Sequence, residues 1–501
     1  MTSTTTPAAG RAAQRPAAGT GGRAARTLRT QIGVLVLVQL VGMMSGTIIA
    51  TALPAITREV DGTTLHYTWM FVTTALASTV TTPLWGRLGD VRDARTVLQW
   101  SIGVYTLGAL LCGLAPTADL LIAARVVQGI GIGGHIALTQ ALAARLVVAR
   151  DRARVNGFMG VSQVVATVTG PLVGALLVQV PHIGWRLCFL LGVPVALVAA
   201  VIVHRVMPRA LPVAAGRVDV VGGALLVLGL TGLLGWVSLV GQHLPGRSPA
   251  SLALVVGSVV VLGVAAWWEW RSPHPIVPLR TLRSRVPLLA ALASLTVGVS
   301  MFGGTVFVTQ YLQLGRGLSA LVAGAALMPM ALATFAAALL VGHRSARTGR
   351  LRRYLLLGTG LVAGGNGLLV VLTPSTPLWV VLVATCAIGA GLGASATNLV
   401  LAAQNATALR DVGAVSGAVV FCRTAGSAVG LTVLGSVVAA YVPSAAGVPA
   451  AALPGLYAHA SSVVFACAAG TALLGVVAVA AMPRIALRTT FDLEPPPRVE
   501  G

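Results

Sequence analysis

Residues 165–177 read VATVTGPLVGALL, and this short stretch decides how the chain is interpreted. It has the apolar character of a helix interior, yet Gly170 and Pro171 stand together in its middle. A proline removes a backbone donor and clashes with the preceding turn, which costs about 3 kcal/mol in a water-exposed helix. We therefore expect the Gly-Pro pair in this apolar helix to have a structural or functional role.

The composition excludes an ordinary soluble globule. Of the 501 residues, 56% are hydrophobic and 9% are charged, whereas soluble domains carry about 25% charged residues. Apolar segments of about 20 residues recur along the chain, as in a polytopic all-α membrane protein. We count fourteen spans, with approximate limits 31–53, 67–86, 96–115, 120–146, 155–179, 185–207, 218–240, 251–270, 286–312, 318–342, 353–372, 378–402, 412–441 and 458–482.

The net charge of +22 would suit a nucleic-acid-binding protein, but the placement of the arginines argues against one. Arginines cluster in the connections that follow even-numbered spans, whereas the other connections hold only Arg58, Arg247 and Arg316. By the positive-inside rule, the N-terminus, the Arg-rich connections and the C-terminal tail are cytoplasmic. The absence of lysine indicates a GC-rich, bacterial source, and we expect the protein in the cytoplasmic membrane.

Cysteine and phosphate-binding patterns exclude several other classes. The five cysteines all fall in apolar spans without a C-x-x-C pair, which predicts neither a disulfide framework nor a zinc site. A P-loop cannot form without lysine, so the chain is not an ATPase. We expect no bound metal.

Shifted by 260 residues, the sequence partly matches itself. GIGIGG at 129–134 lies over GAGLGA at 389–394, and Gly170 lies over Gly430. Spans four and five thus repeat as twelve and thirteen, which predicts a 6 + 2 + 6 arrangement of the kind that alternating-access transporters use. The expected parts are a disordered basic cytoplasmic arm (1–30), an N-terminal six-helix bundle (31–207), two linker helices (218–270), a C-terminal six-helix bundle (286–482) and a cytoplasmic tail (483–501).

Five motifs, in this order, resemble those of the major facilitator superfamily (MFS) in its fourteen-helix drug:proton antiporter branch. They are SGTIIATALPAI (45–56), GRLGDVRDAR (86–95), ARVVQGIGIGG (124–134), TGPLVGA (169–175) and GWRLCFLLGVP (184–194). The resemblance covers essentially residues 31–482. It implies a fold of two pseudo-two-fold related halves, no enzymatic activity, no cofactor, and the proton gradient as energy source.

The resemblance also implies roles for particular residues. Gly170, Pro171 and Gly174 match the antiporter motif of the fifth helix, which in the family packs at the interface of the halves. Such a helix would be close-packed and bendable at the moving seam. In the loop motif, Asp90 would join a charge cluster that helps to hold the outward-facing state; a solvated loop is the alternative. The remaining motif residues that we take as site candidates are Arg92, Arg95, Ser45, Thr47 and Pro54.

Polar side chains embedded in the spans face a cavity or a partner, because a charge at the bilayer centre costs about 2.5–3.5 kcal/mol. Arg125, with Gln128 one turn on, is linked by the resemblance to proton transfer or substrate binding; the alternative is a structural tie to a backbone carbonyl. Arg423 lies over Gln163 in the repeat. His135 either carries protons or packs as a hydrogen-bonded residue. Further cavity candidates are Asn398 and Gln310.

The proton site is open, because no acidic residue falls at the centre of a span. The branch commonly has an aspartate where Ser45 stands here, so Asp119, Glu269 and His135 remain possible. Since the embedded charges are arginines, a neutral or anionic amphiphile is at least as plausible a substrate as a cation.

We expect a monomeric secondary active exporter of hydrophobic small molecules such as drugs or antibiotics. Its partners would be the substrate, protons and the lipid bilayer, with no nucleic acid. The alternatives are a lipid or metabolite carrier on the same scaffold, or a dedicated exporter of one endogenous natural product. A membrane enzyme is disfavoured because no loop is long enough to hold a domain, and a channel because of the 6 + 2 + 6 repeat.

Overall fold

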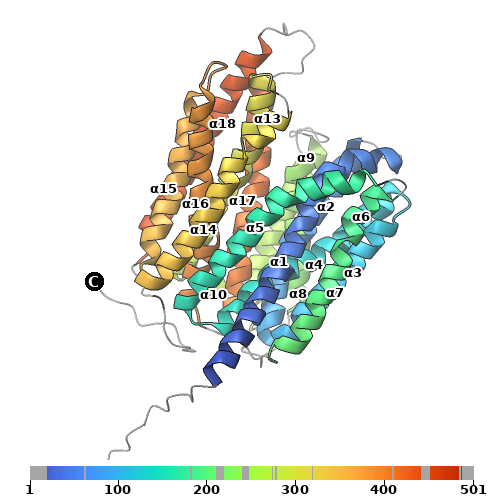
Figure 1. The fold of residues 1–501 in the computed structure, drawn as a ribbon, viewed down its shortest axis with the longest axis vertical. Coiled ribbons are helices and arrows are strands. Elements are labelled where there is room, and N and C mark those ends of the chain that lie inside the picture. Colours follow the sequence, from blue (N-terminus) through green and yellow to red (C-terminus); the bar gives the residue numbers. More distant parts are fainter. Residues whose placement is uncertain are drawn as a thin grey trace, which may run out of the picture.

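The computed structural model forms helices and connecting turns, and no strand occurs in the part of the chain that it describes (Figure 1). That part comprises residues 20–60, 64–180, 183–209, 219–239, 248–273, 275–276, 279–318, 320–408, 411–441, 452–483 and 487. The expected tail over 483–501 therefore lies almost wholly outside the described residues, as do residues 1–19 and Arg410.

The first half of the chain folds into seven helices. They are α1 (Thr20–Glu59), α2 (Thr64–Val91), α3 (Ala94–Leu114), α4 (Ala118–Leu146), α5 (Ala149–Val178), α6 (Gly184–Leu190) and α7 (Gly192–Val206). The prediction of a disordered arm over 1–30 is wrong for residues 20–30, which belong to α1. The reason is that RAARTLRT, at 23–30, consists mostly of good helix formers without a proline, so the helix extends beyond the apolar span.

The second half begins with the hairpin of α8 (Val220–Leu239) and α9 (Pro249–Arg271), followed by a second set of helices. These are α10 (Leu279–Leu282), α11 (Arg285–Phe302), the π-helical η1 (Gly303–Phe307), α12 (Val308–Gln310), the π-helical η2 (Tyr311–Gly315), α13 (Ala320–Ala325), α14 (Met328–Thr348), α15 (Leu351–Leu368), the 3-10 helix η3 (Leu369–Val371), α16 (Leu378–Asn405), α17 (Val412–Tyr441) and α18 (Leu453–Ala480).

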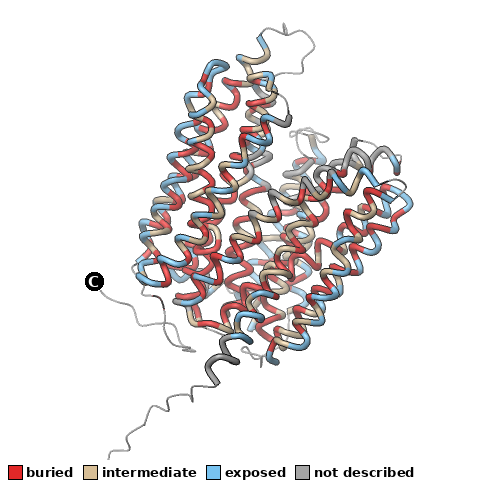
Figure 2. The backbone as a smooth tube through the Cα atoms, in the orientation of Figure 1, coloured by how far each residue is buried: buried red, intermediate tan, exposed pale blue. Residues whose placement is uncertain are grey.

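Helical structure lies within each predicted span, and nine helices among the described residues are long and apolar enough to cross a membrane. The number fourteen stays a prediction. Exposed residues lie along the outer sides of the helices (Figure 2). They include large apolar ones, for example Leu197 and Val201 on α7 and Val256 and Val260 on α9. Exposed apolar surface of this extent suits lipid rather than water as the surrounding solvent.

Asp219 ties the two helices of the α8–α9 hairpin together. Its carboxylate accepts hydrogen bonds from the Gly222 N–H (2.8 Å), Trp268 Nε1 (2.8 Å) and Ser272 Oγ (2.7 Å). The hairpin is thus closed at the end where α8 begins.

The two groups of helices meet near the end of the bundle that holds the start of α1 and the α2–α3, α4–α5 and α14–α15 connections, and they diverge toward the opposite end (Figure 1). We call the first of these ends the basic end because arginines gather in its connections. The contact is made mainly by two helix pairs, α2 with α17 and α5 with α14, and α5 with α16 and α4 with α17 add to it.

Glycines bring the backbones of these helix pairs together. A Cβ on Gly86 of α2 would lie 2.5 Å from the carbonyl oxygen of Gly413, and a Cβ on Gly342 of α14 would lie 2.6 Å from that of Ala153. Ala153 and Gly413 are repeat mates under the 260-residue offset. A comparable close contact is therefore made on both sides of the pseudo-two-fold axis, although Gly86 lies over Ala346 rather than Gly342 under this offset.

Candidate functional site

Asp90 joins the two halves of the molecule at the basic end. It lies at the end of α2, is fully buried, and accepts hydrogen bonds from the N–H groups of Gly413 (3.1 Å) and Ala414 (2.9 Å). These donors belong to the first turn of α17, where backbone N–H groups have no partner within the helix and attract negative charge. The carboxylate thus caps a helix of the opposite half.

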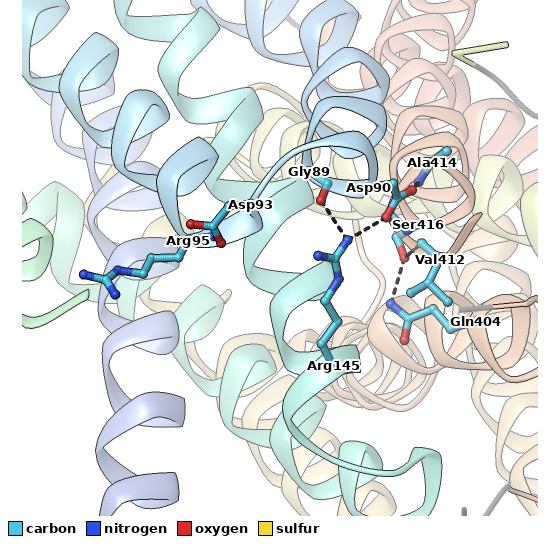
Figure 3. Close-up of polar contacts among 10 residues, drawn as sticks. Gly89, Asp90, Asp93, Arg95, Arg145, Gln404, Val412, Ala414 and Ser416 are labelled. Atoms are coloured by element: carbon cyan, nitrogen blue, oxygen red, sulfur yellow. Dashed lines mark hydrogen bonds and ion pairs between the residues drawn. The ribbon is translucent and has the colours of Figure 1, made fainter. Parts of the chain in front are cut away.

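Arg145, in the last turn of α4, completes this contact. Its Nη2 donates to Asp90 Oδ1 at 2.9 Å and to the Gly89 carbonyl at 2.7 Å (Figure 3). We call Asp90, Arg145, Gly413 and Ala414 the basic-end gate. Arg145 is not among the residues predicted from the sequence; the signal that would have found it is an arginine in the last turn of a span, beside a buried carboxylate that needs a cation.

A second set of polar contacts closes the same end between α5 and α16. Arg152 Nη1 donates to Gln404 Oε1 at 2.9 Å, and Gln404 Nε2 donates to Ser416 Oγ at 2.8 Å. One turn along α5, Asn156 Nδ2 donates to the Thr397 carbonyl at 3.3 Å. Polar contacts therefore join the halves on both sides at the basic end, with an ion pair on one side and these hydrogen bonds on the other.

The other two loop candidates do not join the gate. Arg92 is exposed, and Arg95 donates from Nη2 to the His204 carbonyl at the end of α7. Figure 3 shows Arg95 and Asp93 well apart from Asp90. Asp93 instead caps α3, where it accepts from the Arg95 N–H at 3.2 Å. The structure thus separates Asp90 from the two arginines grouped with it by sequence.

Arg125 lies inside the first half rather than on an open surface. It is 1% exposed, and its Nε donates to the Met70 carbonyl at 2.8 Å while its Nη1 donates to Gln128 Oε1 at 2.7 Å. Its guanidinium lies 5.8 Å from the centre of the Phe189 ring. In this conformation Arg125 ties α4 to α2 through a backbone carbonyl and packs on α6.

Arg423 is the corresponding embedded charge of the second half. It is buried in α17 and donates from Nη1 to the Ala396 carbonyl of α16 at 2.9 Å. Gln163 is half-buried on α5, and Asn398 is buried and donates to the Ala394 carbonyl of its own helix at 2.9 Å. Gln310 is half-buried between the π-helical turns η1 and η2. The contacts described here do not bring these four into one cluster.

The first-helix motif packs within its own half. Ser45 Oγ and Tyr105 Oη are 2.5 Å apart, and Thr47 Oγ1 donates to the Ala166 carbonyl of α5 at 2.8 Å. A Cβ on Gly170 would lie 2.0 Å from Thr47 Oγ1. The expectation that the fifth helix packs between the halves is confirmed by the contact of α5 with α14, which is made nearer the basic end, at Gly157. Gly170 itself does not take part in that contact in this conformation, because it packs on α1.

The remaining motif residues are described only in part. α5 continues as a helix through Pro171, Gly174 is buried in it, and α1 continues through Pro54. The side chains of both prolines lie outside the described residues.

His135 occupies the middle of α4 and is 1% exposed. Its ring lies 5.1 Å, centre to centre, from that of Tyr105. The other two candidate proton sites differ: Asp119 is 89% exposed and lies 3.4 Å from His66, and Glu269 is buried at the end of α9. Among the described residues, no group of three or more His, Cys, Asp or Glu side chains could hold a metal ion.

Comparisons with known proteins place the chain in a family of transporters. An uncharacterized MFS-type transporter of Mycobacterium tuberculosis is 32% identical over 402 residues, covering 80% of this chain and 58% of that protein. The chain thus spans little more than half the length of this relative. The multidrug transporter protein MdtP of Bacillus subtilis is 27% identical, covering 80% of this chain and 74% of MdtP.

Solved structures show the same fold. The human organic anion transporter MFSD10 superposes with a TM-score of 0.59 at 16% identity, over 90% of this chain and 99% of that one. The proton:xylose symporter XylE gives a TM-score of 0.61 at 12% identity, over 89% and 95%. The family model of the Major Facilitator Superfamily matches residues 35–431. The chain, a multi-pass membrane protein of two related halves, therefore belongs to the Major Facilitator Superfamily.

Proposed function

We propose that this transporter exports hydrophobic small molecules across a bacterial cytoplasmic membrane by alternating access, in exchange for protons. The observation that carries the proposal is the basic-end gate, in which Asp90 of one half caps α17 of the other beside Arg145. With the basic end in the cytoplasm, as the arginine distribution favours, this contact closes the cytoplasmic side and leaves the molecule facing outward.

The contacts at the gate suit a step that must be reversible. Each is a hydrogen bond or an ion pair between helix ends, and the adjoining α2–α17 and α5–α14 contacts are made by small residues rather than by interlocked large ones. Contacts of this kind separate without exposing much apolar surface to the cytoplasm. Relatives named as a multidrug transporter, a multidrug resistance protein and an efflux transporter support export as the direction.

The embedded charges bear on the substrate class. Both Arg125 and Arg423 are buried and cationic, and each is held by uncharged acceptors. A neutral or anionic amphiphile therefore fits as well as a cationic drug, and a dedicated exporter of one endogenous compound is the second candidate function. No cofactor is needed, and we propose a monomer as the working unit.

Dye transport in everted membrane vesicles tests the proposal. Ethidium serves as a cationic probe and fluorescein as an anionic one, each measured with and without a proton uncoupler. Uncoupler-sensitive accumulation of either dye supports proton-driven export, and the dye that accumulates reports the substrate charge. Accumulation that persists with the uncoupler would contradict proton exchange. Accumulation of neither dye by correctly folded protein would favour the dedicated exporter.

A further inference from the structure

We propose that His135 binds the proton that drives transport, in a closed site within the first half of the molecule. The inference rests on the proton-driven export proposed above and names the group that performs the coupling. Embedded carboxylates usually serve this purpose, whereas the spans of this chain hold none at their centres.

The position of His135 is the first support. It lies ten residues from Arg125 and ten from Arg145 along α4, about 15 Å from each. Gly42 of α1 leaves room for its ring, because a Cβ there would lie 3.1 Å from His135 Nδ1. The ring also lies beside that of Tyr105 of α3.

The second support is that neither ring nitrogen of His135 has a hydrogen-bond partner among the described residues. The backbone of Ser101 lies beside the ring without meeting hydrogen-bond geometry. A packing histidine normally satisfies at least one nitrogen, because a buried unpaired polar group costs free energy. A site that holds a neutral imidazole ready to accept a proton explains this arrangement.

The surroundings are polar but uncharged. Ser45 and Tyr105 share a hydrogen bond at 2.5 Å. Thr139 Oγ1 donates to the His135 carbonyl at 2.6 Å and approaches Gln39 Oε1 at 3.5 Å. These contacts include no charged side chain. Within this cluster, the change of charge that accompanies proton binding is therefore that of the His135 ring.

The titratable groups of the helices packed against His135 are few. α1 carries none between Gln31 and Thr57; α3 carries Tyr105 and Cys112, with Arg95 at its basic end. α4 itself carries Arg125 and Arg145, with Asp119 at its exposed start. α2, which also packs against α4, carries His66 and Tyr67 at its start and Arg87 and Asp90 at its end. The nearest titratable contact of His135 is therefore the Tyr105 phenol, which stays neutral near pH 7.

Two contacts connect this site to the parts that move. α4 continues from His135 to Arg145, which holds Asp90 in the basic-end gate. Gln39, beside Thr139, donates to the Met159 carbonyl of α5 at 3.2 Å, and α5 packs against α14 of the other half. An imidazolium at position 135 must find acceptors or water, so its formation favours a rearrangement of α1, α3 and α4.

The proton step needs no other reactant. A proton from the external side binds the free ring nitrogen of neutral His135 and gives the imidazolium. After the halves reorient, the same proton leaves to the cytoplasm and restores the neutral ring. One proton moves inward while one substrate molecule moves outward, and no covalent bond other than N–H forms or breaks.

The first test separates coupling from folding with His135→Gln, which keeps hydrogen-bonding capacity but cannot carry a proton at neutral pH. In proteoliposomes with ethidium as probe, accumulation driven by a pH gradient should fall about tenfold, whereas ethidium exchange without a gradient stays within about twofold of the wild type. His459→Gln, at an exposed position on α18, is the matched control and should keep both activities.

Three other results would contradict either the role of His135 or the proton exchange on which it rests. Gradient-driven accumulation by His135→Gln at the wild-type level would overturn the inference, and so would loss of exchange together with driven transport, which marks a packing residue. If wild-type transport ignores the gradient, the proposed proton exchange itself fails.

The second test needs no transported probe. Difference titration of detergent-purified wild type against His135→Gln, from about pH 9 to about pH 5, should show one additional proton bound per wild-type chain. Identical titration curves would show that His135 stays neutral, and would also overturn the inference.

Discussion

Asp90 and Ala414 lie 324 positions apart in the sequence, yet the Asp90 carboxylate accepts a hydrogen bond from the Ala414 N–H at 2.9 Å. The bond joins the last turn of α2 to the first turn of α17, and Arg145 approaches the same carboxylate from α4. Three helices from two halves thus converge on one buried side chain. Whatever separates the halves at the basic end must break this contact first.

Asp90→Asn should weaken the closed basic end while leaving the substrate region intact. The amide cannot provide the negative charge that both Arg145 and the α17 terminus attract, so we expect transport to slow by about tenfold. Ethidium binding should change little. An Ala414→Cys reporter, buried in the wild type, should react faster with an impermeant maleimide in everted vesicles. Asp151→Asn, at an exposed position of α5, is the control; equal loss of binding and transport would count against a gating role.

Arg145→Gln should be more harmful than Asp90→Asn, because it leaves a buried carboxylate without its cation. Removing one partner of a buried ion pair costs about 3–5 kcal/mol, whereas a neutral pair avoids that cost. The double variant Arg145→Gln/Asp90→Asn should therefore transport better than Arg145→Gln alone. Initial rates of dye accumulation in everted vesicles, normalised to protein level, measure this coupling. Strictly additive losses would mean that the two side chains act independently.

Gly86→Ala should hold the halves apart at the basic end. The added Cβ would lie 2.5 Å from the Gly413 carbonyl oxygen, which is backbone and cannot rotate away. A shift of about 1.4 kcal/mol would change the ratio of closed to open states about tenfold. Reaction of the Ala414→Cys reporter measures that ratio. Gly103→Ala on α3 adds the same methyl group where nothing lies within 4 Å and should have no effect. An unchanged reporter rate in Gly86→Ala would remove the close-packing account of the gate.

The fold could be predicted largely from the sequence because membrane spans carry their own signal. A span must be predominantly apolar over a fixed length, so the ranges 120–146 and 412–441 differ little from α4 and α17. The start of α1 could not be placed, because helix propensity outside the bilayer leaves no hydropathy signal and the Arg-rich residues 20–30 read as an arm.

In the candidate site, only the residues that belong to a recognisable motif could be predicted, and their contact partners could not. Asp90 could be singled out by its motif, but its partners could not, since two of them are backbone N–H groups that no side chain marks. Conversely, Gly170 was assigned to the seam between the halves, although it packs on Thr47 of its own half. A small residue signals close approach without indicating which helix approaches.

Arg423→Ala should change substrate selection if the embedded arginine meets the substrate. Arg423 donates to the Ala396 carbonyl through Nη1, and its remaining guanidinium donors suit an anionic group. A hydrogen bond to a charged group contributes about 1.5–3 kcal/mol, so fluorescein transport should fall about tenfold or more while ethidium transport is kept. Arg344→Ala, exposed on α14, is the control. Equal loss of both dyes would assign Arg423 to the packing of α17 against α16.

Gly170→Ala should impair transport through α1 rather than through the other half. The new Cβ would lie 2.0 Å from Thr47 Oγ1 and 2.7 Å from Thr47 Cβ, so α1 and α5 must move apart. Because Thr47→Gly removes both atoms, the double variant Gly170→Ala/Thr47→Gly should recover part of the lost ethidium transport. Recovery should be incomplete, because a glycine in the helix costs about 1 kcal/mol of stability. Gly435→Ala on α17, where nothing lies within 4 Å, should be silent. Recovery would show that the glycine before Pro171 works by fitting α5 to the first-helix motif, whereas a double variant no better than Gly170→Ala would place the decisive contact of Gly170 elsewhere.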